Sequence, residues 1–346
     1  MNDLPEKPPR RPRYTGRNPR NFKDKYKEHQ SDRYADDVSK VVDRGQTPAG
    51  KHRPIMVSEI LTALALVPGN TVVDCTLGYG GHAREFLAAI QPGGCFLGVD
   101  ADPIELPKTE ARLRAIAPAE ALIDVRRMNF AGVATFLAAK APQGVDALLV
   151  DLGVSSMQLD DPSRGFSFKE DGPLDMRMNP LVGLSASALL STLDSVQLSA
   201  ILVENSDEPN ADKIAEKILA AHQKSPLLTT FALVEVLRMT TKTLSDADSN
   251  GTLRRVFQSL RIAVNQELRS LDAFLRQLPS FMKKGGRVAM LTFHSGEDRR
   301  VKSSFNDGFR NGLYEYVSKE VIRASPAEQR SNGRSSSAKL RIAIRS

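Results

Sequence analysis

The sequence has few cysteines and no long apolar segment. Two cysteines among 346 residues, Cys75 and Cys95, cannot form a disulfide framework, which excludes a small secreted fold held together by disulfides. No apolar run reaches the roughly 18 to 20 residues that cross a bilayer, and the polar start lacks the apolar core of a signal peptide. The cysteines and histidines show no metal-ligand spacing, so we expect no metal site. Together these absences predict a soluble, cytoplasmic protein.

Positive charge is in excess but unevenly placed. The chain carries 48 Lys or Arg and 41 Asp or Glu, a net charge of +7. Residues 1–50 hold 12 basic and 8 acidic residues, and residues 319–346 hold 7 and 2, so the stretch between them is slightly acidic. Residues 1–50 also contain six of the 20 prolines and almost no apolar periodicity, which predicts a disordered extension. Its basic start, residues 7–13, is interpreted either as an RNA contact or as a solubilising tail.

From residue 52 onward, short β-rich apolar runs alternate with helical patterns. The predicted strands cover residues 71–74, 95–100, 121–126 and 146–151. The predicted helices cover residues 57–67, 83–90 and 105–117. Continuous apolar strands that alternate with helices are typical of a parallel sheet covered on both faces. This part of the chain therefore predicts a doubly wound α/β domain.

The pattern becomes almost wholly helical between residues 185 and 278. Helical spacing is clearest at residues 211–222, 231–239 and 253–278, and strand patterns return at residues 287–293 and 339–345. We therefore predict an α/β domain over residues 51–180 and 279–346. A helical, substrate-recognising insertion over residues 181–278 would interrupt it.

A glycine-containing turn joins the first predicted strand to the next helix. Residues 78–81 contain three glycines, and glycine at such a turn lets the backbone approach a ligand above the sheet. The next strand ends in Asp100, placed to accept hydrogen bonds from ribose hydroxyls. The turn lacks G-x-G-x-x-G spacing, and the acid Asp74 would repel a pyrophosphate but attract a sulfonium or amino group. S-adenosylmethionine is therefore favoured over nicotinamide or flavin cofactors, with a ligand-free turn as the alternative.

Two further strand ends point to the same edge of the sheet. Asn129 and Phe130 follow the third strand and could border an adenine ring. Asp151 ends the fourth strand, which in doubly wound enzymes commonly carries the chemistry. The alternative for Asp151 is a carboxylate that caps a turn.

Six longer motifs are similar to those of one family. They are residues 74–82, 151–161, 164–168, 171–178, 257–265 and 293–299, in that order along the chain. From residue 52 to residue 345 the sequence resembles the bacterial small-subunit ribosomal RNA cytosine-N4 methyltransferases. It departs from their usual pattern in three places. Residues 1–50 have no counterpart, residues 251–255 replace a His-Pro-Ala-Thr-Arg run, and Gly296 stands where Leu is usual.

The resemblance implies a class I (Rossmann-like) S-adenosylmethionine-dependent methyltransferase with a helical inserted domain. It would methylate the exocyclic N4 amine of one cytidine in the decoding region of 16S rRNA, either as free RNA or within the small ribosomal subunit. The positions that match the family's cofactor contacts are Gly80, Gly81, His82, Asp100, Phe130, Asp151 and Gln158. The oligomeric state stays open between a monomer and a homodimer.

This chemistry requires a proton acceptor and a means of holding an unstacked base. The N4 lone pair is delocalised into the ring, so the amine must lie in line with the sulfonium methyl while an acceptor draws off its proton. The candidate acceptors are, in order, Asp151, Asp175 and His294. The candidate substrate contacts are Phe166 and Phe168 for stacking, and Arg164 and Arg177 for phosphates. A small core cluster and ion pairs with nearby acids are the alternatives for these four residues.

Two other functions compete with this one. DNA amino-methyltransferases often carry an acid or Asn, two prolines and an aromatic after the fourth strand, whereas residues 151–154 here read Asp-Leu-Gly-Val. A non-catalytic ribosome-assembly factor on the same fold would be supported by loss of Asp100 or of the glycine turn. Both are present.

Overall fold

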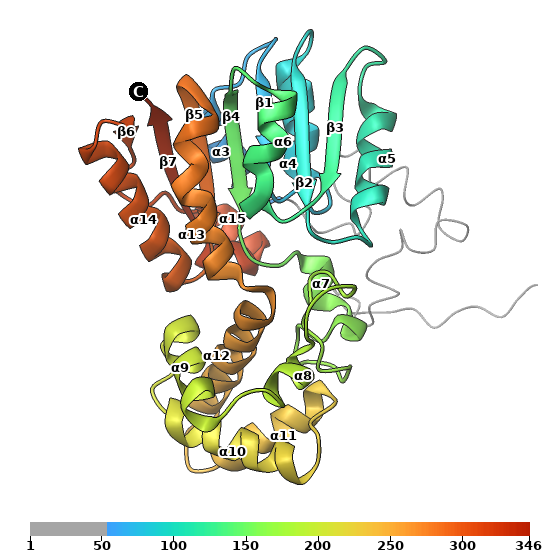
Figure 1. Cartoon of the computed structure of the whole chain (residues 1–346), viewed down its shortest axis with the longest axis vertical. Helices are drawn as coiled ribbons and strands as arrows, with labels where there is room; N and C mark the ends of the chain where they lie inside the picture. Colours follow the sequence, from blue (N-terminus) through green and yellow to red (C-terminus); the bar gives the residue numbers. More distant parts are fainter. Residues whose placement is uncertain (1–53) are drawn as a thin grey trace, which may run out of the picture. The chain divides into compact units, whose positions relative to one another are not determined.

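Seven strands form one sheet, in the order β3-β2-β1-β4-β5-β7-β6 (Figure 1). The structure, a computed structural model, describes residues 54–346, so the predicted disorder of residues 1–50 lies outside the described residues. The strands are β1 (Thr71–Asp74), β2 (Cys95–Asp100), β3 (Leu122–Arg127), β4 (Val145–Asp151), β5 (Met282–Thr292), β6 (Tyr314–Val317) and β7 (Lys339–Arg345). Strands β1 to β5 run parallel, whereas β7 runs antiparallel to its neighbours β5 and β6.

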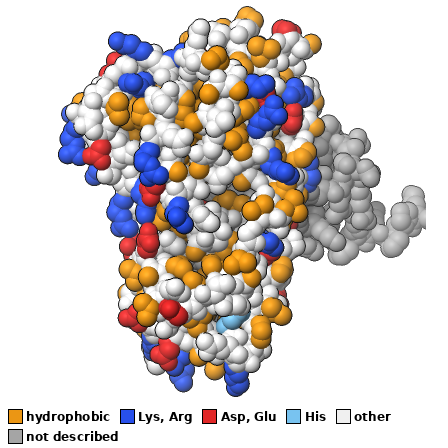
Figure 2. Space-filling view, in the orientation of Figure 1, with side chains coloured by type: hydrophobic (Ala, Val, Ile, Leu, Met, Phe, Trp, Pro, Cys, Tyr) orange, Lys and Arg blue, Asp and Glu red, His pale blue; other side chains and the backbone are white. Residues whose placement is uncertain are grey.

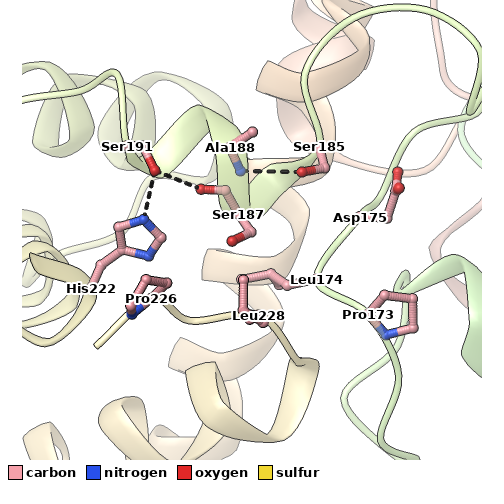
Figure 3. A pocket seen from close by; sticks show the side chains of 10 residues that line it. All are labelled: Pro173, Leu174, Asp175, Ser185, Ser187, Ala188, Ser191, His222, Pro226 and Leu228. Atoms are coloured by element: carbon pink, nitrogen blue, oxygen red, sulfur yellow. Dashed lines mark hydrogen bonds between the residues drawn. The ribbon is translucent and has the colours of Figure 1, made fainter.

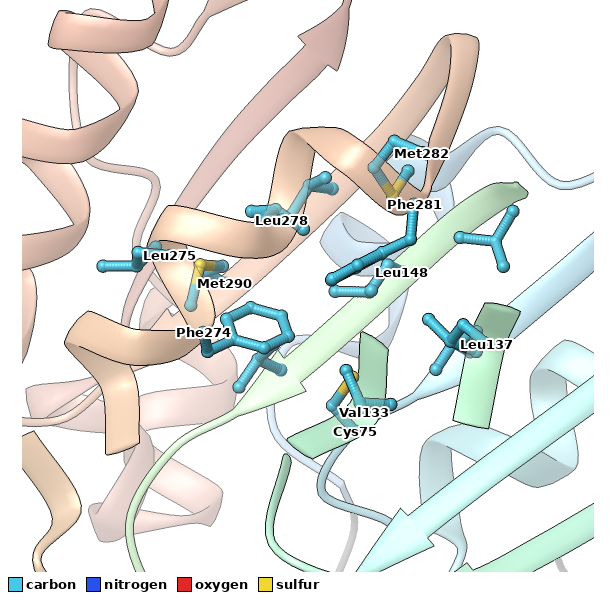
Figure 4. Close-up of a cluster of buried hydrophobic side chains, with 14 of the residues drawn as sticks. Cys75, Val133, Leu137, Leu148, Phe274, Leu275, Leu278, Phe281, Met282 and Met290 are labelled. Carbon is cyan, nitrogen blue, oxygen red and sulfur yellow. The ribbon is translucent and has the colours of Figure 1, made fainter. Parts of the chain in front are cut away.

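Helices cover both faces of the sheet. They are α3 (Val57–Leu64), α4 (Gly81–Ile90), α5 (Leu106–Ile116), α6 (Val133–Lys140), α13 (Glu267–Gln277) and α14 (Ser295–Arg310). The first three share one apolar cluster with the sheet, which includes Ile60 and Phe86. The last three share a second cluster, in which Leu137 and Phe274 pack near Leu148 of β4 (Figure 4). This arrangement confirms the doubly wound α/β prediction.

A third apolar cluster belongs to a separate group of helices. They are α8 (Ala186–Leu190), α9 (Ser195–Ser206), α10 (Ala211–Lys224), α11 (Thr230–Thr240) and α12 (Asp246–Asn265). Their core includes Leu198, Ile218, Leu233 and Leu260, all buried. Figure 1 shows this group beyond the carboxyl ends of the parallel strands. The candidate site at those strand ends therefore has the helical group on its open side.

The helical run predicted over residues 253–278 is not continuous. It is divided at Gln266, which has φ +50° and separates α12 from α13. The reversal lets Leu271 and Phe274 of α13 join the sheet cluster, whereas Leu260 of α12 stays with the helical group. On the other side, Leu174 packs with the helical group although it precedes residue 181. The domain boundaries at residues 180 and 279 themselves stay a prediction.

Candidate cofactor and substrate site

Three acidic side chains lie at the carboxyl ends of neighbouring parallel strands. Asp74, Asp100 and Asp151 end β1, β2 and β4, which are adjacent in the sheet. Thr76 joins two of these ends. Its N–H donates to Asp74 Oδ1 at 3.0 Å, and its Oγ1 accepts from the N–H of Asp151 at 2.6 Å. The sheet therefore brings together the three acids that the strand patterns singled out.

These acids have few compensating positive charges. Burial raises the pKa of Asp74 to about 7, and the nearby Asp100 adds to the rise. Burial, with the charges of Asp74 and Glu297, raises the pKa of Asp151 to about 8. Burial also raises the pKa of Asp100, against hydrogen bonds from backbone amides. Among the described residues, no Lys or Arg pairs with these three carboxylates, so the site favours a cationic ligand.

The glycine turn is held in place from α5. The N–H of Gly78 donates to Asp100 Oδ2 at 2.7 Å, and its carbonyl oxygen accepts from Thr109 Oγ1 at 2.7 Å. Gly80 has φ +81°, and a Cβ there would lie 2.8 Å from Thr109 Cγ2. At Gly81 a Cβ would lie 2.4 Å from the Pro54 side chain. Both glycines are thus needed for the turn to close, whatever ligand it holds.

His82 is neutral and turned mainly toward the backbone. It is 6% exposed, and its Nε2 donates to the carbonyl oxygen of Ile55 at 3.0 Å. Its Nδ1 lies 3.9 Å from Asp151 Oδ2, too far for a hydrogen bond. Burial lowers the pKa of His82 to about 4, and the hydrogen bond to Ile55 opposes this effect only in part. His82 therefore lies beside Asp151 without neutralising it.

Phe130 and Gln158, the other predicted cofactor contacts, are placed differently. Phe130 follows β3 and is half-buried, with its ring edge-on to Phe274 at 5.5 Å. Gln158 lies in the short helix α7 (Ser156–Asp160), and its Oε1 accepts from the N–H of Ser155 at 2.9 Å. Its Nε2 donates to Asp102 Oδ2 at 2.8 Å. The Gln158 amide is therefore already used within the protein.

Asp175 and the two predicted phosphate-binding arginines form internal ion pairs. Arg177 donates to both carboxylate oxygens of Asp175, at 2.8 and 2.7 Å. Partial burial is the largest single influence on the pKa of Asp175 and raises it, but the hydrogen bonds and charge of Arg177, with the charge of Arg164, together lower this pKa below its usual range. Arg164 pairs with Asp102 at 2.9 Å. The alternative interpretation, an ion pair with Asp161 or Asp175, describes the present contact of Arg177, whereas the partner of Arg164 is Asp102, an acid that was not predicted.

The two predicted stacking phenylalanines pack within the protein. Phe166 is 5% exposed in the core of the helical group. Phe168 is half-buried beside that core, edge-on to Phe257 at 5.4 Å. In this arrangement Phe166 cannot stack on a base, and Phe168 offers only its uncovered part. The core-cluster alternative fits Phe166.

His294 belongs to a buried polar group with Glu297, whose charge also acts on Asp151. Its Nε2 lies 3.2 Å from Glu297 Oε1, and Glu297 Oε2 accepts from the N–H of Phe293 at 2.8 Å. Glu297 is 2% exposed, and this burial raises its pKa, but the contact with His294, the N–H of Phe293 and the charge of Arg261 together lower the pKa below the usual range. A Cβ at Gly296 would lie 3.1 Å from His294 Nδ1. The glycine that replaces the usual Leu thus leaves room for the imidazole.

Two residues that hold the site together, Asp102 and Asn265, were not predicted from the sequence. Asp102 accepts hydrogen bonds from Gln158 and Arg164. The only sequence feature that could have suggested a role for it is its position two residues after Asp100, which ends a predicted strand. Asn265, within one family-like motif, binds the N–H of Met178 and the carbonyl oxygen of Met176, both at 2.7 Å. No periodicity or spacing could have paired residues so far apart in the chain.

Two glycines of the family-like motifs have a steric role. A Cβ at Gly165 would lie 2.1 Å from the carbonyl oxygen of Pro173. One at Gly172 would lie 1.8 Å from that of Pro162. The segments around residues 162–165 and 172–175 therefore cross in direct backbone contact, which only glycine permits.

A pocket of about 380 Å³ lies in the helical group, away from the sheet edge (Figure 3). Asp175 lines it together with serines of α8 and its flanks. His222 of α10 accepts from the N–H of Leu227 at Nδ1, 3.1 Å, and so donates from Nε2 to Ser191 Oγ, 2.9 Å. Burial lowers the pKa of His222. Of the predicted catalytic residues, Asp175 alone borders this pocket, whereas Asp151 lies at the sheet edge.

Two further properties concern the described residues only. Within residues 54–346, no group of three or more His, Cys, Asp or Glu is placed to hold a metal ion. Over the same range, no helix combines the length and the apolar character needed to span a membrane.

The sheet order and the glycine turn define the class of protein. An antiparallel β7 inserted between β5 and β6, with the turn after β1 and an acid at the end of β2, is the arrangement of class I S-adenosylmethionine-dependent methyltransferases. The profile of the MraW methylase family matches residues 49–346. The chain belongs to this family.

Similar proteins carry related names. The chain is 45% identical to "Ribosomal RNA small subunit methyltransferase H 2" of Alkaliphilus metalliredigens over 350 aligned residues, which cover 100% of both chains. It is 45% identical to "Ribosomal RNA small subunit methyltransferase H 1" of Lachnoclostridium phytofermentans, over 97% of this chain and 93% of that one. It is 36% identical to "Ribosomal RNA small subunit methyltransferase H" of Symbiobacterium thermophilum, over 85% of this chain and 96% of that one.

The comparisons also concern residues 1–50, which were expected to have no counterpart in the usual family pattern. The family match begins at residue 49, in agreement with this expectation, but the Alkaliphilus protein aligns over the whole of this chain. The Symbiobacterium protein, almost all of which is aligned, leaves 15% of this chain unmatched. The segment before residue 49 is therefore outside the part that the family match covers, although one relative aligns with it.

Proposed function

We propose that this protein transfers a methyl group from S-adenosylmethionine to the N4 amine of a cytidine in the decoding region of 16S rRNA. The observation that carries the proposal is the set of three acids, Asp74, Asp100 and Asp151, around the glycine turn of a chain in the MraW methylase family. Acting on ribosomal subunits, the protein would work in the cytoplasm.

The residues present fit this cofactor. The buried acids disfavour an anionic pyrophosphate and favour a sulfonium or an amino group. The carboxylate of Asp100, fixed by the N–H groups of Gly78 and Asp102, retains lone pairs for ribose hydroxyls. Phe130 provides an apolar border beside β3. When bound, S-adenosylmethionine supplies an electrophilic methyl group on a positively charged sulfur.

Asp151 is the proton acceptor that the site supports best. Its side chain is 29% exposed, so it can meet a substrate, unlike Asp74, which is 2% exposed as a residue. Its pKa of about 8 makes the Asp151 carboxylate a stronger base than an ordinary aspartate, and the positive charge of a bound cofactor would favour the ionised form that can accept the amine proton. Asp175 is committed to Arg177, and His294 faces Glu297. We infer that these two position parts of the site.

Recognition of RNA would depend on particular residues rather than on a broad basic surface. Figure 2 shows Lys and Arg interspersed with Asp and Glu on the face in view. A segment with almost balanced charge offers little non-specific attraction to phosphates. Arg177, which is 23% exposed at its side chain, could exchange Asp175 for a phosphate. The half-buried Phe168 is the better of the two candidates for contact with an unstacked base.

The deciding experiment supplies labelled S-adenosylmethionine with unmodified small ribosomal subunits, naked 16S rRNA or DNA. Mass spectrometry then identifies the methylated nucleosides. N4-methylcytidine from an RNA substrate is expected. A product from DNA alone would favour the DNA-modifying alternative. Cofactor binding with no product from any substrate would favour the non-catalytic assembly factor.

The role of Asp151 has its own test. Asp151→Asn should lower kcat about a hundredfold or more, because proton removal loses its acceptor. Asp175→Asn is the matched control, since it removes a carboxylate of the ion pair with Arg177. An equal fall in kcat for both variants, with cofactor affinity unchanged by calorimetry, would contradict the assignment of Asp151.

A further inference from the structure

A chain of hydrogen bonds leads from the glycine turn toward the loop that follows α7. Asp100 accepts from the N–H of Gly78 at 2.7 Å and from the N–H of Asp102 at 2.8 Å. Asp102 is 4% exposed, and its Oδ1 accepts from the N–H of Ile104 at 2.8 Å. Its Oδ2 accepts from Arg164 Nη1 at 2.9 Å. The backbone of Asp102 is thus tied to the end of β2, and its carboxylate is held by Ile104, Arg164 and the Nε2 of Gln158, which donates to Oδ2 at 2.8 Å.

Arg164 continues this chain into the loop. Its Nη2 donates to the carbonyl oxygens of Arg177 and Met178, at 3.1 and 2.7 Å. Its own carbonyl oxygen accepts from the N–H of Met176 at 3.0 Å. The Arg164 side chain is only 11% exposed. A buried guanidinium that joins one carboxylate to two carbonyl groups fixes the geometry of all three.

The segment that Arg164 holds is strained. Met176 is fully buried and has φ +62°, a conformation that residues other than glycine rarely adopt. Such a backbone persists only where its surroundings determine it. Here Arg164 holds one side, and Asn265 binds Met176 and Met178 from the other. Loosening either contact should release the segment.

We propose that Asp102 and Arg164 are a positioning pair that couples occupation of the cofactor site to the order of residues 175–178. The proposal rests on the proposed function, because it takes Asp100 as the group that binds the cofactor ribose. A ligand on Asp100 restrains the end of β2 and, through the hydrogen bond from the N–H of Asp102, also Asp102. It therefore restrains Arg164 and the segment that Arg164 holds. By thermodynamic linkage, an RNA that orders the segment strengthens cofactor binding by the same factor.

The test measures hydrogen exchange of the backbone amides in residues 175–178, with and without S-adenosylhomocysteine. In the unmodified protein the ligand should slow this exchange about fivefold or more, the lower end of typical coupling between sites. In Arg164→Gln the slowing should fall below about twofold. Arg164→Lys should restore it only in part, because an ammonium group cannot reproduce the planar fork of contacts.

A matched control separates coupling from general loosening. Arg334→Gln breaks the contact of Arg334 with Asp160 of α7, 2.8 Å long, without touching residues 175–178. This variant should keep the full slowing. A merely structural role of Arg164 would speed exchange equally with and without ligand, leaving the ratio unchanged, and that result would overturn the proposal.

The outcomes also separate this proposal from the proposed function. If calorimetry detects no binding of S-adenosylhomocysteine to the unmodified protein, both are overturned. If the ligand binds but exchange of residues 175–178 is unaltered, the coupling alone is overturned. The unmodified protein therefore provides a decisive result even if a variant fails to fold.

Discussion

The acidic residues at the strand ends (the sheet side of the candidate site) and those in the ion pairs of Arg164 and Arg177 (the loop side) differ in whether a basic residue compensates them. On the sheet side, Asp74 and Asp151 lack basic partners within the described residues, and burial raises the pKa of each. On the loop side, Arg164 pairs with Asp102, and Arg177 pairs with Asp175. The sheet side is therefore short of positive charge, whereas the loop side is already neutralised.

This difference indicates which side awaits a ligand. An uncompensated buried acid costs folding free energy, and proteins accept such costs at functional sites. A paired arginine and acid satisfy one another, and they hold the backbone around them. The sheet side thus has the electrostatics of a cation-binding site. The loop side has the properties of a support, whose failure should disturb shape before chemistry.

The largest expected effect concerns that support. Gly172→Ala places a Cβ 1.8 Å from the carbonyl oxygen of Pro162, which no side-chain adjustment can relieve. The backbone must move, so we expect a loss of roughly 3 kcal/mol or more in the free energy of unfolding, measured by urea denaturation. Gly333→Ala is the control, because nothing lies within 4 Å of its added Cβ. Equal midpoints for the two variants would contradict the crossing of residues 162–165 and 172–175.

This crossing illustrates what the sequence could and could not predict. The strand and helix patterns predicted most of the sheet because buried parallel strands are continuous apolar runs. They missed β6, a four-residue edge strand with two exposed central residues. They also missed the break at Gln266, because no glycine or proline marks it. Local patterns report local burial, and neither feature has a distinctive local pattern.

The site was predictable to the same extent and for a related reason. Carboxyl ends of adjacent parallel strands meet at one edge, so Asp74, Asp100 and Asp151 could be placed together from their positions alone. Pairs such as Asp102 with Arg164 lie 62 residues apart and depend on tertiary packing. The same packing buries Phe166, which a pattern of two nearby phenylalanines could not distinguish from an exposed pair.

A smaller effect should separate the two sides by ligand affinity. Asp100→Asn replaces the carboxylate that holds Gly78 and that faces the proposed ribose position. We therefore expect the affinity for S-adenosylhomocysteine to fall tenfold to hundredfold, or by about 1.5–3 kcal/mol. Asp175→Asn, on the loop side, should change the affinity of the free protein less than threefold. Isothermal titration calorimetry measures both. A greater loss for Asp175→Asn would reverse the assignment of the two sides.

The contrast also predicts stability changes of opposite sign. Asp151 has a raised pKa of about 8, so the folded protein holds this proton more tightly than the unfolded chain does. The resulting contribution to the free energy of unfolding is lost as the pH rises through that value. Asp151→Asn should therefore stabilise the ligand-free protein at pH 9, by about 1 kcal/mol or more, with little change at pH 4. Glu297, whose pKa is lowered, stabilises above its ordinary pKa, and this contribution is lost as the pH falls.

Glu297→Gln should accordingly lower the melting temperature at pH 7 to 9, where Asp151→Asn raises it. Calorimetric melting curves of both variants across this range provide the comparison. The two carboxyl groups interact, since the charge of Glu297 contributes to the raised pKa of Asp151. A destabilised Asp151→Asn protein at pH 9 would mean that the carboxylate is compensated, and the sheet side would lose its distinctive electrostatics.

The smallest expected effect concerns residues 1–48, which have an excess of basic residues, unlike either side of the site. Removing residues 1–48, which precede the family match, deletes 12 basic and 8 acidic residues. If these residues add only non-specific attraction, kcat at saturating small subunits should be unchanged, and KM should rise a few-fold at low salt. The rise should shrink as salt increases, because each phosphate contact releases counterions whose entropy gain falls with salt concentration. A fall in kcat that persists at high salt would instead place residues 1–48 in the reaction. Specific recognition would then extend beyond the loop side of the site.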